Sequence, residues 1–79
     1  MATNLDEMLR RWREEDEEAR EIRRKNADWK FIEEQPEPLR SALKCFVELG
    51  DLRLAAKIAE MGVDEFNQLR IKARIPIVL

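Results

Sequence analysis

The chain is short of the residues on which metal sites, disulfides and β-sheets depend. Its 79 residues include no histidine, two glycines, three prolines and a single cysteine, Cys45. One cysteine cannot form an intrachain disulfide, and without histidine no Cys/His metal site can be assembled. The low glycine, proline and β-branched content argues against an all-β fold. We therefore expect an all-α protein that holds neither a metal nor a cofactor.

Groups that serve catalysis are also scarce. No nucleophile can be paired with a general base, and no Gly-rich phosphate loop is present. The acidic run 14–18 lies on consecutive helical positions, so its carboxylates point around the axis and cannot converge on one ion. Cys45 lies beside an apolar helix face, which favours a small buried residue over a redox switch. We expect no catalytic residues, no enzymatic activity and no small-molecule substrate.

Long apolar runs are missing as well. The N-terminal residues 1–8 contain no apolar segment of the signal-peptide type, and no stretch is long enough to span a membrane. We expect a cytoplasmic location and no membrane partner.

Charge is abundant but divided between the two signs. Charged residues make up 41% of the chain, with a net charge of −2. Residues 1–35 carry eight basic and eleven acidic side chains, whereas residues 51–79 carry five basic and four acidic ones. A protein that binds nucleic-acid phosphates normally has a larger basic excess, so this distribution weakens a DNA-binding hypothesis.

The first region, residues 1–34, is expected to be a long charged amphipathic helix over 4–33. Asn4 followed by Glu7 forms a capping-box pattern, and no glycine or proline interrupts the stretch before Pro36. Acidic residues precede basic ones by four positions in four pairs, which is the favourable order. These pairs are Asp6–Arg10, Glu7–Arg11, Asp16–Arg20 and Glu21–Lys25.

Apolar residues recur along this helix at spacings of three and four. They are Leu5, Met8, Trp12, Ala19, Ile22 and Trp29. Glu15 and Asn26 fall on the same line, and such polar interruptions favour a weak helical seam over a true coiled coil.

The second region, residues 35–79, is expected to be a helix-turn-helix-like helical domain. The segment 34–38, which contains Pro36 and Pro38, breaks the first helix. Pro38 suits the first turn of a second helix over 38–49, which stops at Gly50. Its buried face is expected to comprise Leu39, Ala42, Leu43, Phe46 and Val47.

Two shorter helices follow. Asp51 is expected to cap one over 52–61 that stops at Gly62, and Asp64 to cap another over 64–73. The apolar tail 75–79 is expected to pack against the domain or to pair as a short edge strand.

The length of the first helix indicates a partner. Thirty helical residues extend about 45 Å, whereas a compact domain of the remaining residues is about 25 Å across. The helix should therefore overhang its own domain, and a homodimer or a protein partner would cover its apolar residues. The candidate contact residues are Leu5, Met8, Trp12, Ile22, Trp29 and Phe31.

The two short helices at 52–61 and 64–73 form the candidate DNA-binding unit. In a helix-turn-helix the second helix lies in the major groove, where Asn and Gln read adenine and basic side chains hold phosphate. The candidate DNA contacts are Asn67, Gln68, Arg70, Lys72 and Arg74. The acidic Asp64 and Glu65 oppose such a contact, and a hairpin that only closes a small core is the alternative.

Residues 55–69, A-A-K-I-A-E-M-G-V-D-E-F-N-Q-L, followed by I-P at 75–76, resemble the C-terminal half of a family of small prokaryotic proteins. That UPF-type family is regarded as antitoxins, and its tail reads A-A-x-L-A-G-M-S-x-x-E-F-x-x-L-L and then G-I-P-V. The match covers about a third of the chain. It consists of Ala55, Ala56, Ala59, Met61, Glu65, Phe66, Leu69, Ile75 and Pro76. Glu60 stands at the family's turn glycine, and the family's N-terminal region is replaced by the long charged helix.

The resemblance implies an antitoxin-type regulator with a helix-turn-helix, partnered with a PIN-domain ribonuclease toxin. The first helix would then bind the toxin, with Trp12, Trp29 and Phe31 as anchors. The basic run 23–25 either approaches the toxin's acidic active site or forms a solvated helix face. The alternative function is a structural or scaffold protein that self-associates through the long helix and the apolar tail, with no DNA binding.

Overall fold

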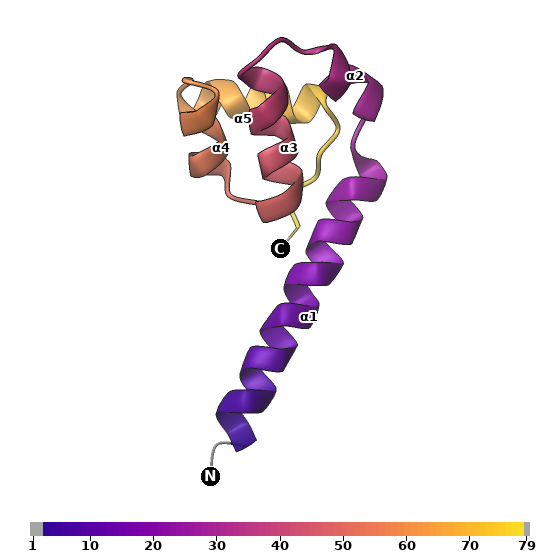
Figure 1. The fold of residues 1–79 in the computed structure, drawn as a ribbon, viewed down its shortest axis with the longest axis vertical. Coiled ribbons are helices and arrows are strands. Elements are labelled where there is room, and N and C mark those ends of the chain that lie inside the picture. The colour runs from indigo at the N-terminus through magenta and orange to yellow at the C-terminus, as the bar shows by residue number, and fades with distance from the viewer. Residues whose placement is uncertain (1–2, 79) are drawn as a thin grey trace.

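The computed structural model describes residues 3–78, which form five helices and contain no strand (Figure 1). The helices are α1 (Thr3–Asn26), α2 (Trp29–Glu34), α3 (Leu39–Leu49), α4 (Leu52–Ile58) and α5 (Val63–Lys72). The expected all-α class is confirmed, as is a long N-terminal helix followed by shorter ones.

The single helix expected over 4–33 is wrong, because the chain breaks between α1 and α2. Asp28 adopts an extended conformation, and its carboxylate accepts a hydrogen bond from the backbone N–H of Phe31, which makes it the N-cap of α2. Its own N–H donates to the carbonyl of Ala73 at the end of α5, 2.8 Å away. The break therefore lets α2 turn onto the rest of the chain.

Helix α3 forms almost as expected over 38–49. The Pro38 residue provides its N-cap, and Gly50, at φ 66°, provides its left-handed C-cap. Four of the five residues expected on its inner face are buried, namely Ala42, Leu43, Phe46 and Val47, and Leu39 packs half-buried against them.

The α4–α5 turn differs from the expected one. Asp51 caps α4 as expected, through a hydrogen bond from the N–H of Leu54. However, α4 ends at Ile58, because Glu60 adopts φ 58° and the N–H groups of Glu60 and Met61 bond back to Lys57 and Ala56. This pattern is a Schellman C-cap with a non-glycine residue in the left-handed position.

The start of α5 also corrects the expectation. Gly62 is the N-cap of α5, not the stop of α4, and Asp64 lies inside the first turn rather than at the cap. An acidic residue in a first turn still interacts favourably with the helix dipole.

The core lies between α2, α3, α4, α5 and the start of the tail. Its largest fully buried side chains are Phe66, Ile32, Leu43, Ile75 and Val47. The rings of Phe46 and Phe66 meet edge to face with centroids 6.2 Å apart. Ile75 thus packs against the domain as expected. The alternative, a short edge strand, is wrong for residues 75–78, because the described residues contain no strand.

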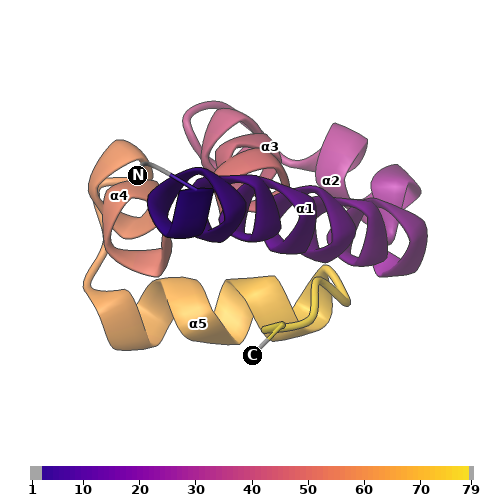
Figure 2. The ribbon, with the colours of Figure 1, turned by 90° about the horizontal axis from the view of Figure 1, so that it is seen from below.

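Helix α1 extends beyond the other four helices. The molecule measures 50 × 23 × 18 Å, and Figure 1 shows the N-terminal end of α1 far from the rest of the chain. Seen from below, the α1 helix lies between α3 on one side and α5 with the tail on the other (Figure 2). The expected overhang is therefore present. We call residues 27–78 the head and residues 5–18 the projecting segment.

Candidate partner-binding helix

The projecting segment is exposed at each of its positions. Four large apolar side chains gather within its first two to three turns: Leu5, Met8, Leu9 and Trp12, between 41% and 58% exposed. We call these four residues the apolar stripe. Contiguous exposed apolar side chains with a charged surround are typical of a protein-binding surface.

After Asp6 and Glu7, the charges of the projecting segment are arranged in two blocks. Arg10, Arg11 and Arg13 form a basic block around Trp12, and the acidic run 14–18 follows directly. The segment thus presents apolar, positive and negative surface within 14 consecutive residues.

The C-terminal end of α1 is held by Arg23, a member of the basic run 23–25 that was expected to face solvent or a partner. Arg23 is 7% exposed, and its Nε donates to the carbonyl of Val47 over 2.7 Å. Arg20 donates to the carbonyl of Glu48, and Arg24 binds the Glu48 carboxylate through Nε and Nη2. Burial, and secondarily the nearby charge of Arg20, lowers the pKa of Arg23.

These contacts anchor α1 on the end of α3. The last carbonyls of a helix lack intrahelical partners and carry partial negative charge, so guanidinium donors stabilise them. Gly50 leaves the space that this needs, since a Cβ there would lie 2.8 Å from Nη1 of Arg23. The anchor fixes the direction in which the projecting segment leaves the head.

The remaining partner-contact candidates divide between surface and core. Ile22 and Trp29 are exposed, whereas Phe31 is half-buried and packs against the core. The indole Nε1 of Trp29 donates to the carbonyl of Arg24, so this side chain covers the break between α1 and α2. Leu9 belongs to the exposed surface although the seam spacing did not select it.

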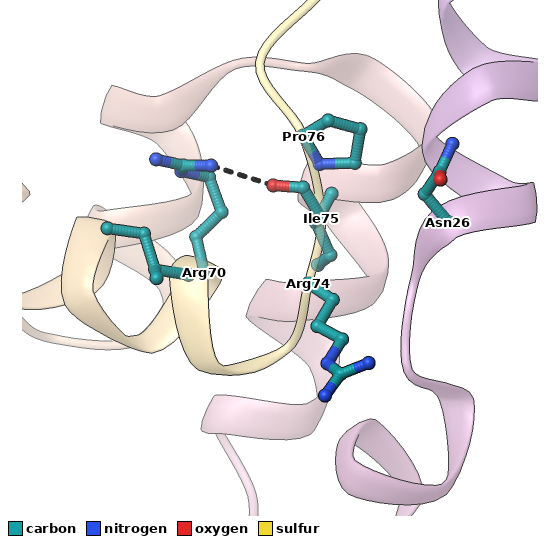
Figure 3. Close-up of a pocket in the computed structure, with 6 residues that line it drawn as sticks. Asn26, Arg70, Arg74, Ile75 and Pro76 are labelled. Atoms are coloured by element: carbon teal, nitrogen blue, oxygen red, sulfur yellow. Dashed lines mark hydrogen bonds between the residues drawn. The ribbon is translucent and has the colours of Figure 1, made fainter.

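The DNA-contact candidates also divide into two groups. Arg70 donates to the side-chain oxygen of Asn67. Through Nη1 it also donates to the carbonyl of Ile75 (Figure 3). Burial lowers the pKa of Arg70. Gln68, Lys72 and Arg74 are exposed, and the Arg74 side chain extends away from that of Arg70. Asn67 and Arg70 therefore hold the tail in this structure, and the other three form the free polar surface.

A shallow depression of about 400 Å³ lies between these residues and α1. Asn26, Ile71 and Pro76 line it together with Arg70, Arg74 and Ile75 (Figure 3). Its wall contains no carboxylate or cysteine, and no group of three or more metal-ligating side chains exists among the described residues.

Cys45 lies half-buried on α3, where burial, and secondarily the charge of Asp51, raises the pKa of its thiol. A raised pKa keeps the thiol protonated and weakly nucleophilic, which agrees with a packing role.

Comparisons with protein-family models, with curated proteins and with solved structures find no match for this chain. None of the helices within residues 3–78 combines the length and the apolar character that crossing a bilayer requires.

Proposed function

We propose that this chain is a small cytoplasmic, non-enzymatic regulatory protein that binds a partner protein along α1. The observation that carries the proposal is the exposed apolar stripe on a helix segment that projects from a well-packed head. Fully burying an exposed large apolar side chain contributes about 1.5–3 kcal/mol. These four are about half exposed, so each would contribute about half of that, and together they form an anchor for a partner. An amphipathic helix that lays its apolar face into a groove is a recurring recognition mode.

Two backbone positions support the antitoxin-type form of this proposal. The family pattern quoted above has glycine at two places, and in this chain Glu60 and Arg74 occupy them. Within residues 3–78 they are the two non-glycine residues with positive φ, both at 58°. Left-handed backbone favours glycine. The two glycines of the family pattern therefore correspond to the two positions at which a glycine would suit the backbone of this chain. We accordingly propose a PIN-domain toxin as the partner class.

The test is affinity purification of the tagged chain from its own cells, quantified by mass spectrometry. The stripe variant carries Leu5→Ser, Met8→Ser and Trp12→Ser. The matched control carries Leu54→Ser, Ile71→Ser and Ile77→Ser, three exposed apolar residues outside α1. Proteins bound through α1 should be enriched with the wild type and the control and lost with the stripe variant. Equal enrichment with all three proteins would refute the proposal.

Co-expression tests the antitoxin-type form separately. A PIN-domain protein encoded beside this chain should arrest growth, and co-expression of the wild type, but not of the stripe variant, should restore it. Growth arrest that the wild type does not relieve would remove the toxin from the proposal and leave protein binding in place.

DNA contact through residues 52–74 is a further part of the antitoxin-type form. Gln68, Lys72 and Arg74 are its exposed candidates. Replacing Lys72 and Arg74 with Ala should weaken binding to operator DNA and reduce its salt dependence. An unchanged affinity, or no affinity at low salt in the wild type, would exclude this contact.

A further inference from the structure

Five apolar residues of α1 and Glu15 are arranged symmetrically along one line of the helix. Spacings of three and four alternate along one line of the helix, which we call the α1 seam: Leu5, Met8, Trp12, Glu15, Ala19 and Ile22. Each member has a counterpart at the same distance on the other side of the midpoint between Arg13 and Glu14. A helix with this pattern can pair with an inverted copy of itself so that all six positions meet a partner.

We propose that a second copy of this chain binds antiparallel along the α1 seam. This inference rests on the proposed function and deepens it, because a second copy would cover the apolar stripe of α1 whenever the toxin is not bound there. With the two midpoints superposed, Leu5 of one copy faces Ile22 of the other, and Met8 faces Ala19. Trp12 faces Glu15, so no carboxylate meets its own copy.

Charge complementarity selects this orientation. Beside the seam, Arg11 of one copy lies opposite Glu18 of the other, and the two-fold axis repeats the pair. More generally, the basic block 10–13 of one helix lies along the acidic run 14–18 of its neighbour. A parallel pair in register would instead bring Glu15 against Glu15 and Trp12 against Trp12, and it would set the two heads side by side.

A groove between α1 and Val78 of the tail is where the second helix would lie. The groove has a volume of about 640 Å³ and is lined by Ala19, Ile22 and Val78, with Glu15, Asp16 and Glu18 along its edge. Small Ala19 lies at the groove, opposite the long Met8 of the other copy. The apolar wall and the acidic edge match the apolar stripe and the basic block that would enter it.

The test is sedimentation velocity over a range of concentrations, with charge reversals at the Arg11–Glu18 pair. The wild type should form a dimer. Arg11→Glu and Glu18→Arg each place like charges opposite one another twice, so each should weaken the dimer about tenfold. The double variant, and an equimolar mixture of the two single variants, should recover wild-type affinity.

The controls separate orientation from general charge effects. Arg10→Glu and Glu17→Arg change the same charges on the helix face that points away from the seam, and they should leave the affinity unchanged. If the two helices were parallel, Arg11→Glu would place a glutamate of one copy beside Asp16 of the other. The double variant would then not recover wild-type dimer affinity. Circular dichroism of each variant checks that α1 stays helical.

Three results would overturn the proposal: a wild type that stays monomeric at the highest attainable concentration, single variants that dimerise normally, or a double variant that does not recover. A monomer that still captures cellular proteins through the apolar stripe refutes self-association and leaves the proposed function standing. A monomer that captures nothing refutes both.

Discussion

The helices of the projecting segment and of the head are stabilised in water by different means. In the head, apolar faces of α2 to α5 are buried against one another around Phe66. Asp28 and Asp51 cap the starts of α2 and α4, and Gly50 caps the end of α3. In the projecting segment the apolar stripe has no second layer within residues 3–78. Helix propensity stabilises it instead. The expected pairs Asp6–Arg10 and Glu7–Arg11 do not form, since the ion pairs within residues 3–78 all lie outside the projecting segment. Packing between helices therefore stabilises the head, whereas the apolar stripe of α1 stays exposed and accessible to another molecule.

The largest expected effect compares one aromatic residue from each region. Phe66 is fully buried and Trp12 is half exposed. Phe66→Ala should lower the free energy of unfolding by about 3–5 kcal/mol, whereas Trp12→Ala should change it by less than about 0.5 kcal/mol in the monomer. Urea denaturation at low protein concentration measures both. A large loss of monomer stability in Trp12→Ala would mean that the stripe is part of the core.

If Phe66→Ala does not fold, Phe66→Leu keeps the comparison measurable. It retains most of the buried volume and should cost about 1–2 kcal/mol.

The second prediction concerns the joint between the two regions. Arg23→Ala removes donors from the carbonyls at the end of α3 and should cost about 1.5–3 kcal/mol. The control Arg24→Ala breaks an exposed pair with Glu48 and should cost about 1 kcal/mol or less. Chemical denaturation of the two variants distinguishes them, and equal losses would show that burial of Arg23 contributes nothing.

Gly50 gives an independent measure of the same joint. Gly50→Ala meets both a left-handed φ and the guanidinium of Arg23, and it should cost about 1–2 kcal/mol. In the double variant Gly50→Ala, Arg23→Ala, no guanidinium remains for the new Cβ to meet. The loss of unfolding free energy in the double variant should therefore be smaller than the sum of the losses in the two single variants. Strict additivity would contradict the close approach.

Some helix caps were predictable from the sequence, because they depend on neighbouring residues. Gly50 and Asp51 are examples, and the periodic burial of α3 also followed from spacing alone. The break at Asp28 was not predicted. An Asp can cap a helix, but this break also depends on the hydrogen bond from the Asp28 N–H to the carbonyl of Ala73, which only the tertiary fold brings close. No glycine or proline marked it.

The burial of Arg23 could not be predicted from the sequence. One of three adjacent basic residues is buried because α3 ends beside it, and only the tertiary fold establishes that proximity. By contrast, the exposure of Leu5, Met8 and Trp12 followed from the overhang, which is a matter of length. The candidate surface was thus more predictable than the anchor that orients it.

A smaller effect of opposite sign is expected at the α4–α5 turn. Glu60 holds a left-handed φ of 58° without being glycine. Glu60→Gly should therefore raise the free energy of unfolding by about 1 kcal/mol. The same substitution at the exposed, right-handed helical residue Glu65 should lower it by about 0.5–1 kcal/mol. Thermal or urea unfolding of both variants checks the signs, and a loss at both positions would contradict the left-handed turn.

The smallest effect is a pH dependence confined to the head. The pKa of Glu37 lies below its ordinary value, because Ser41 and, secondarily, Arg40 donate hydrogen bonds to its carboxylate. A lowered folded pKa means that the contribution to stability is present above the ordinary value of 4.5 and is lost as the pH falls through the folded value. Glu37→Gln should therefore flatten the acid side of the stability profile. An NMR titration of the Glu37 carboxyl carbon provides the direct measurement: Ser41→Ala should raise its pKa toward the ordinary value, and an unchanged titration would remove this contact as the cause.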